Sequence, residues 1–135
     1  METEDTIERP LLTLSLLPDT LAICHLERDA AIPTWACQGN FYSLTRTPHE
    51  LSIVCRQEDV PSDVTCDCGW RALSSDGPLG FTLTGLVETL AEPLALAGIT
   101  IFFISTFHTD YVMVKQNDLQ IAILALRNAG HTVRI

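Results

Sequence analysis

The stretch Ser105–Asp110 (STFHTD) gathers hydroxyls, an imidazole and a carboxylate between two apolar runs. Phe102–Ile104 precedes it and Tyr111–Val114 follows it, and both runs are typical of buried strands. A polar segment between two core strands is either a hairpin turn or one wall of a pocket. In a pocket, Asp110 would hold a cationic group, whereas in a plain turn it would bond only its own backbone.

The cysteines are the second group of residues with possible chemistry. The chain has five, an odd number, and Cys66 and Cys68 are separated by one residue. Paired zinc ligands are usually separated by about two to four residues. No second pair or nearby histidine completes a ligand set, so we expect no metal site. The pattern favours reduced thiols, with Cys66 and Cys68 exposed on a polar linker.

Motifs that mark common enzymes are absent from the sequence. We find no G-x-S-x-G elbow, phosphate-binding loop, dinucleotide fingerprint or H-E-x-x-H pattern. The four histidines share no spacing. One alternative is that the protein is an enzyme, a small cofactor-free isomerase or cyclase with His108 and Asp110 as its acid–base pair. The sequence favours a non-catalytic protein that needs no cofactor.

Composition narrows the class of protein. The chain has 135 residues, of which 47% are hydrophobic and 19% charged, as in globular domains. Its net charge of −9 disfavours nucleic acid and anionic membrane surfaces as partners. No run approaches the roughly 18 apolar residues of a membrane helix. Residues 1–10 are acidic, unlike the start of a signal peptide, so we expect a disordered acidic tail and a cytoplasmic protein.

Residues 69–135 are predicted to form six elements in the order β-α-β-β-α-β. This order is typical of the ferredoxin-like fold, an α+β arrangement with a four-stranded antiparallel sheet. Pro93 predicts a kink in the first helix because proline lacks a backbone donor. The expected elements are a strand at Trp70–Ser74, a helix from Thr84 to Gly98, strands at Ile99–Thr106 and Tyr111–Lys115, a helix from Asn117 or Asp118 to Gly130, and a strand at His131–Ile135.

Residues 11–62 are rich in predicted strands. The strands are Leu11–Leu17, Thr20–Leu26 and a hairpin within Asn40–Cys55, and Ala30–Ala36 has room for one helical turn. With so few helical residues, this segment is interpreted as a degenerate, strand-rich half-copy of the second half. Polar and turn-forming residues at 63–68 then form a linker.

Three runs resemble ACT domains, the small ligand-binding modules of amino-acid metabolism: residues 80–126, Phe41–Cys55 and Trp70–Gly80. Within the first run, the resemblance is carried by Ile104–Val114 and by the helix start Gly85–Val87. It implies an ACT unit at 69–135 preceded by a degenerate ACT-like half. The nearest subgroup is the short tandem ACT proteins, which are related to the cytosolic arginine sensor of the mTOR pathway and to aspartate-kinase regulatory domains.

The resemblance implies that a free amino acid, or a similar zwitterion, binds where two ACT units meet. Backbone N–H groups at the helix start would bind its carboxylate, in keeping with the affinity of helix N-termini for anions. Asp110 would hold the cationic group, and the end of the preceding strand would supply carbonyl and hydroxyl contacts. Ser74, Ser75 and Asp76 either line the same pocket or form an ordinary turn. The implied ligand-binding residues are Leu83, Thr84, Gly85, Leu86, Val87, Ser105, Thr106, Phe107, Asp110 and Ser75.

One position departs from the arginine-binding pattern. In arginine-binding members an acidic residue lies two positions before the helix glycine, and here that position is Leu83. Burying a guanidinium without a carboxylate partner is costly, so arginine is disfavoured as the ligand.

The sequence therefore predicts a non-catalytic amino-acid sensor that acts through ligand-stabilised association. We expect a homodimer that contacts an unidentified protein partner. The alternatives are the small enzyme above and a ligand-free structural interaction module.

Overall fold

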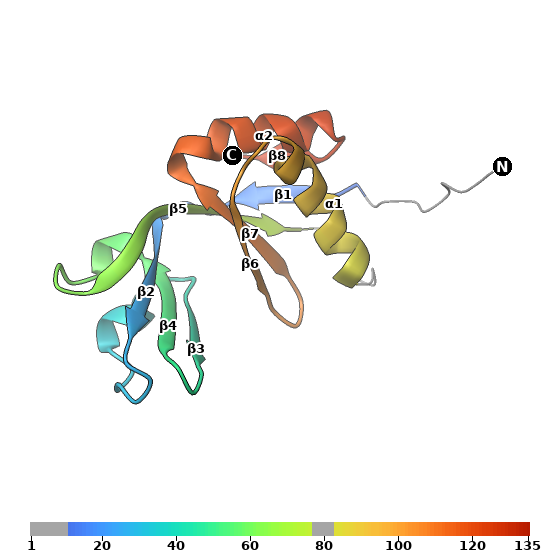
Figure 1. Ribbon diagram of the computed structural model, residues 1–135. Helices are drawn as coiled ribbons and strands as arrows, with labels where there is room; N and C mark the ends of the chain where they lie inside the picture. The colour runs from blue at the N-terminus through green and yellow to red at the C-terminus, as the bar shows by residue number, and fades with distance from the viewer. Residues whose placement is uncertain (1–10, 77–82) are drawn as a thin grey trace. The chain divides into compact units, whose positions relative to one another are not determined.

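The computed structural model describes residues 11–76 and 83–135, which form two compact units (Figure 1). The terminal unit comprises Met1–Leu17 and Leu73–Ile135, and the middle unit comprises Pro18–Ala72. Each unit has a separate buried core. The tail predicted at residues 1–10 lies outside the described residues.

The terminal unit contains the predicted β-α-β-β-α-β order, and its fold is of the ferredoxin-like α+β class. Gly98 (φ +75°) follows the first helix and Gly130 (φ +102°) follows the second, as expected for glycine after a helix end. Its elements are the end of β5 (Thr65–Ser75), α1 (Leu83–Leu96), β6 (Ile101–Ser105), β7 (Asp110–Lys115), α2 (Leu119–Asn128) and β8 (Thr132–Arg134).

Strand β1 (Thr13–Leu16) changes the expected four-stranded sheet, because it inserts between β5 and β8. It pairs antiparallel with β5, with Leu14 opposite Ser75, and parallel with β8, with Leu14 opposite Val133. The sheet of the terminal unit therefore runs β6–β7–β5–β1–β8. The sequence analysis grouped Leu11–Leu17 with residues 18–62, whereas β1 pairs with β5 and β8 and residues up to Leu17 fall in the terminal unit.

The core of the terminal unit follows from the alternation of its strands and the periodicity of its helices. Leu73, Val112 and Val114 point from the sheet toward the helices and are fully buried. Both helices cover this face, and their contributions to the core are Leu90 and Leu94 from α1 and Leu119, Ala122, Ile123 and Leu126 from α2. Within the described residues, no helix has the length and apolar character needed to cross a membrane.

The middle unit is a small sheet in the order β3–β4–β2–β5. Its strands are β2 (Leu21–Leu26), β3 (Ser43–Arg46), β4 (Leu51–Arg56) and the first part of β5. The predicted helical turn is present as the short 3-10 helix η2 (Thr34–Cys37). Residues 65–68, predicted as linker, are strand instead, because they pair with β2 from Ile23 to His25.

Helix α1 continues through Pro93, and a histidine compensates for the hydrogen bond that proline cannot make. Proline has no N–H to donate to the carbonyl four residues earlier, here Thr89. Nε2 of His131 lies 3.4 Å from the Thr89 carbonyl oxygen, and the Leu12 backbone N–H donates to Nδ1 at 3.1 Å. Since Nδ1 accepts, the proton lies on Nε2, and the neutral imidazole joins α1, β1 and β8.

Protonation of His131 would break this junction. The side chain is 5% exposed, and burial lowers its pKa below the ordinary value of 6.5, although the bond to the Thr89 carbonyl opposes that shift. Between this lowered pKa and 6.5, the unfolded chain binds more protons than the folded one, so stability falls as pH falls. Above 6.5 both states are neutral at this site and its contribution is complete.

We therefore predict that the free energy of unfolding decreases as pH is lowered from about 7 to 5. Urea titrations followed by helical circular dichroism would measure it, because α1 and α2 both lie in the terminal unit. His131→Gln should be less stable than the wild type at pH 7 but show a flatter pH dependence. His25→Gln, an exposed histidine of β2, is the matched control and should keep the wild-type slope. An unchanged slope in His131→Gln would contradict the assignment.

Candidate functional site

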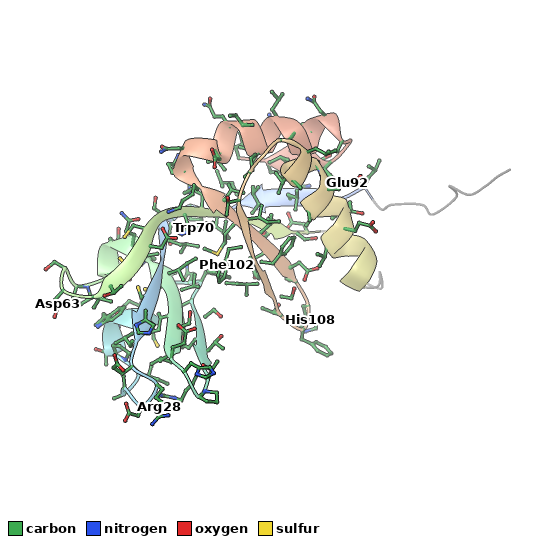
Figure 2. All side chains as sticks on the ribbon, in the orientation of Figure 1. Arg28, Asp63, Trp70, Glu92, Phe102 and His108 are labelled. Atoms are coloured by element: carbon green, nitrogen blue, oxygen red, sulfur yellow. The ribbon has the colours of Figure 1, made fainter. Side chains whose placement is uncertain are left out.

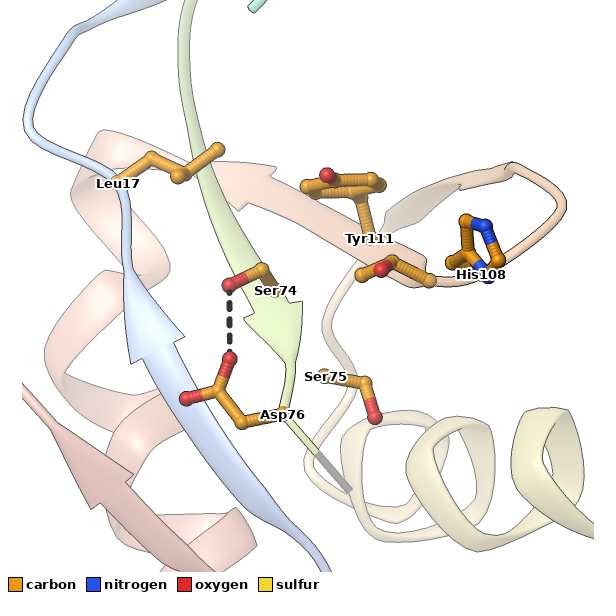
Figure 3. Close-up of a pocket in the computed structure, with 7 residues that line it drawn as sticks. Leu17, Ser74, Ser75, Asp76, His108 and Tyr111 are labelled. Atoms are coloured by element: carbon orange, nitrogen blue, oxygen red, sulfur yellow. Dashed lines mark hydrogen bonds between the residues drawn. The ribbon is translucent and has the colours of Figure 1, made fainter. Parts of the chain in front are cut away.

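A hollow of about 470 Å³ opens in the terminal unit where β5 ends and the β6–β7 turn begins (Figure 3). Three of its lining residues come from the end of β5 and three from the turn and the start of β7. The lining residues are Leu17, Ser74, Ser75, Asp76, His108, Thr109 and Tyr111. Its composition is mixed, with hydroxyls, a carboxylate and an imidazole beside apolar surface.

Asp76, directly after β5, connects one side of the hollow to strand β1 by hydrogen bonds. Ser15 Oγ donates a hydrogen bond to Asp76 Oδ2, and Ser74 Oγ lies 3.5 Å from Oδ1 (Figure 3). The Asp76 backbone N–H donates to the Thr13 carbonyl at 2.7 Å. Asp76 is therefore tied to strand β1, and the insertion of β1 beside β5 fixes this wall.

The opposite side of the hollow is the β6–β7 turn, which Thr106 closes. Thr106 Oγ1 accepts from the Thr109 N–H at 3.1 Å and donates to the Thr109 carbonyl at 3.0 Å, beside a backbone bond of 2.8 Å. Phe107 at the tip is 96% exposed, and its ring meets that of His108 edge-on at 4.9 Å. Figure 2 shows His108 projecting from this end of the hairpin.

Three of the predicted ligand-binding residues share the helix-facing side of the sheet at this same end. Ser105 and Asp110 are register partners across β6 and β7, and alternation puts Asp110 on the face of Val112 and Val114. Ser75 shares the face of Leu73 on β5 by the same argument. The structure thus brings Ser75, Ser105 and Asp110 to one end of the sheet.

Asp110 is 6% exposed, which makes it the most buried acidic residue of the described chain. Among the described residues, none pairs with its carboxylate as an ion or hydrogen-bond donor. Its carboxylate oxygens are not among the fully buried, unpartnered polar atoms of the described residues, so they keep contact with solvent. Its position therefore suits a cationic group brought by another molecule.

The remaining predicted ligand-binding residues lie at the start of α1, which begins at Leu83. Thr84, Gly85, Leu86 and Val87 are all helical, and the first backbone N–H groups of a helix have no acceptor within it. The side chains of Leu83, Thr84 and Leu86 lie outside what the structure describes, as do residues 77–82. Thr84, where the sequence predicted this helix to begin, is its second residue.

The acid–base pair of the enzyme alternative is not assembled. The His108 ring is exposed against Phe107, whereas the Asp110 carboxylate is buried on the helix-facing side. Nor does any group of His, Cys, Asp and Glu in the described residues have the geometry to hold a metal ion.

Sequence reasoning did not identify Leu17, Thr109 or Tyr111 as lining residues. Leu17 comes from the strand that the sequence assigned to the other half, so no local pattern could place it here. The sequence predicted Tyr111 to be a buried strand residue. Because successive side chains of β7 point to opposite faces, Tyr111 faces away from Asp110 and lines the hollow.

Two family models match successive parts of the chain. One, described as an ACT domain, matches residues 65–128. The other, described as an N-terminal domain, matches residues 19–63. Residues 65–128 belong to the ACT domain family.

Individual relatives extend this assignment. The chain is 43% identical to an Agrobacterium tumefaciens protein of known crystal structure, with 92% of both chains covered and a TM-score of 0.87. It is 34% identical to the rat cytosolic arginine sensor for mTORC1 subunit 1 over 87% of this ACT protein and 42% of the sensor. The Clostridium acetobutylicum aspartate kinase shares its fold, at 12% identity and a TM-score of 0.63 over 93% of this chain and 37% of that one. The chain spans less than half the length of the curated sensor.

We predict that Thr106→Val destabilises the β6–β7 turn, because it removes both side-chain hydrogen bonds to Thr109. The expected loss is about 1 kcal/mol in the free energy of unfolding, measured by urea denaturation. Thr106→Ser keeps the hydroxyl and is the matched control, with a much smaller loss. Equal stability of the two variants would contradict the role given to the hydroxyl.

Proposed function

We propose that this ACT protein is a non-catalytic sensor that binds a free amino acid at the end of the terminal-unit sheet. The amino-acid carboxylate would accept hydrogen bonds from the backbone N–H groups at the start of α1, from Leu83 to Val87. Its α-ammonium would pair with Asp110, beside Ser105 and Ser75. Thr106 and Phe107 would contribute through their backbone carbonyls, since the Thr106 hydroxyl is used within the turn.

The proposal depends above all on one observation, the buried Asp110 at the start of β7, at the same end of the sheet as the end of β5 that precedes α1. A zwitterionic amino acid carries its ammonium and carboxylate groups on one Cα, and this end of the sheet offers a carboxylate for the first and helix amides for the second. The names of the curated relatives, arginine sensors, and the fold shared with aspartate kinases support regulatory ligand binding over catalysis.

Leu83 governs the proposed specificity. An apolar residue at this position leaves a guanidinium without a partner, so a small or apolar amino acid is favoured over arginine. This distinguishes the chain from the relatives that are named arginine sensors.

Association of ACT units is the proposed output. A second copy of the chain would cover the ligand, giving a homodimer in the cytoplasm that contacts a further protein. The ligand can shift such an equilibrium only through its different affinity for the free and associated states.

The proposal predicts that one or a few free amino acids raise the melting temperature of the full chain. At a free concentration one hundred times Kd, a ligand that binds only the folded state adds about 2.7 kcal/mol of stability. For a chain of this size that corresponds to a shift of several degrees. A panel of the free amino acids, with arginine expected to be inactive, would identify the ligand by thermal shift.

Asp110→Asn separates loss of binding from loss of folding. Removing a buried charge should leave the unliganded melting temperature equal to or above that of the wild type. The same variant should weaken binding by about 30-fold or more, the effect of about 2 kcal/mol expected when a buried charge loses its partner. Asp118→Asn, a partly buried aspartate at the start of α2, is the control and should bind as the wild type does.

Three outcomes would count against the proposal. A panel without any effect would favour the structural interaction module. Chemical turnover of an added amine or keto acid would favour the enzyme. Full ligand-induced stabilisation of Asp110→Asn would remove Asp110 from the site.

A further inference from the structure

Four of the five cysteines lie close together in the middle unit, and their sulfurs differ in access to solvent. Cys24 on β2 and Cys55 on β4 are buried, at 2% and 1% exposure. Cys66 on β5 is the register partner of Cys24, and Cys68 is exposed. All are thiols in this structure.

The exposed pair is unusually close. The sulfurs of Cys66 and Cys68 are 2.9 Å apart. A disulfide requires about 2.05 Å between sulfurs, so less than roughly 1 Å of approach is needed. Residues two apart on an extended strand have Cα atoms about 6.7 Å apart, at the long end of the range that disulfides bridge.

An irregularity in β5 accounts for the approach. Ile23 pairs with Asp67 but Leu21 pairs with Trp70, so β5 carries one extra residue where it passes Cys68 and Gly69. Gly69 adopts a φ of +81°, which favours glycine, and its N–H donates to Gln57 Oε1 at 2.7 Å. The irregularity begins directly after Asp67, so Cys68 leaves the regular pairing with β2 that Cys66 keeps.

We propose that Cys66 and Cys68 form a peroxide-sensitive dithiol that closes reversibly to an intrastrand disulfide. This assigns a modification site to a segment of the middle unit that the proposed amino-acid site does not use. The inference is independent of the proposed sensing function.

The reaction needs a hydroperoxide as oxidant. The Cys68 thiolate, the more accessible sulfur, attacks the terminal peroxide oxygen, the O–O bond breaks, and the leaving oxygen departs as water or an alcohol after taking a proton. Cys66 sulfur then attacks the sulfenic acid of Cys68, which forms the S–S bond and releases hydroxide, and the Cys66 proton converts it to water. The two sulfurs together lose two electrons, and the peroxide gains them.

The surroundings favour this pair over the buried one. The hydrogen bond to Cys68 raises the pKa of Cys66, so Cys66 keeps its proton and acts as the resolving thiol. The pKa of Cys24 is also raised, by its bond to Cys55 and by burial, which keeps that thiol protonated and away from solvent.

The test treats the reduced full chain with hydrogen peroxide at about one equivalent and then alkylates the remaining thiols. Alkylation should fall from five cysteines to three, and dithiothreitol should restore all five. Trypsin releases Gln57–Arg71, which contains Cys66 and Cys68 and no other cysteine. This single peptide should therefore be lighter by two hydrogens and unalkylated.

Single serine variants make the assignment falsifiable. Cys68→Ser should keep its remaining cysteines alkylatable, and Cys66→Ser should accumulate a sulfenic acid at Cys68 that dimedone traps. Cys37→Ser, outside the cluster, should close the disulfide as the wild type does. Cross-linked peptides containing Cys24 or Cys55, a sulfinic acid at Cys68 with Cys66 still alkylated, or unchanged alkylation of all five cysteines would each overturn the proposal.

Discussion

The carbonyl oxygen that Pro93 leaves without a donor is the constraint on which the terminal unit depends. His131 reaches it from the start of β8 and accepts the Leu12 N–H with its other nitrogen. One neutral side chain thereby joins the first strand, the first helix and the last strand. A proline that would weaken an isolated helix instead fixes where the N-terminal segment must lie.

The hollow beside the candidate site is built on strand β1, which this junction holds. Because β1 lies beside β5, Ser15 and Thr13 hold Asp76, and Leu17 lines the hollow. The opposite wall is a turn that Thr106 closes with its own hydroxyl. Asp110, the most buried acidic residue that the structure describes, lies next to this turn on the helix-facing side of β7.

Local patterns predicted most of the elements but not the assignment of every strand. The α2 helix and the β6–β7 hairpin follow from periodicity and from glycines at the helix ends, which act over a few residues. The location of β1 depends on pairing with β5 and β8, which are distant in the sequence, and no neighbouring residue signals it. The sequence did not predict the strand at 65–68, because Asp67 and Gly69 are residue types typical of turns. In the structure, β5 has an irregular pairing at this point. Ser75, Ser105 and Asp110 were predicted together because the resemblance to ACT domains implied a ligand site at these strand ends, whereas Leu17 and Tyr111 required the fold.

We propose that an amino acid binds beside Asp110 at the end of the terminal-unit sheet. Two-dimensional amide NMR of nitrogen-15-labelled protein, recorded with and without a mixture of the free amino acids, tests it most directly. If an amino acid binds there, its addition should shift mainly the amide resonances of Gly85, Ser75, Ser105 and Asp110. Unchanged resonances at these positions at saturating concentrations, or shifts confined to residues 18–72, would contradict it.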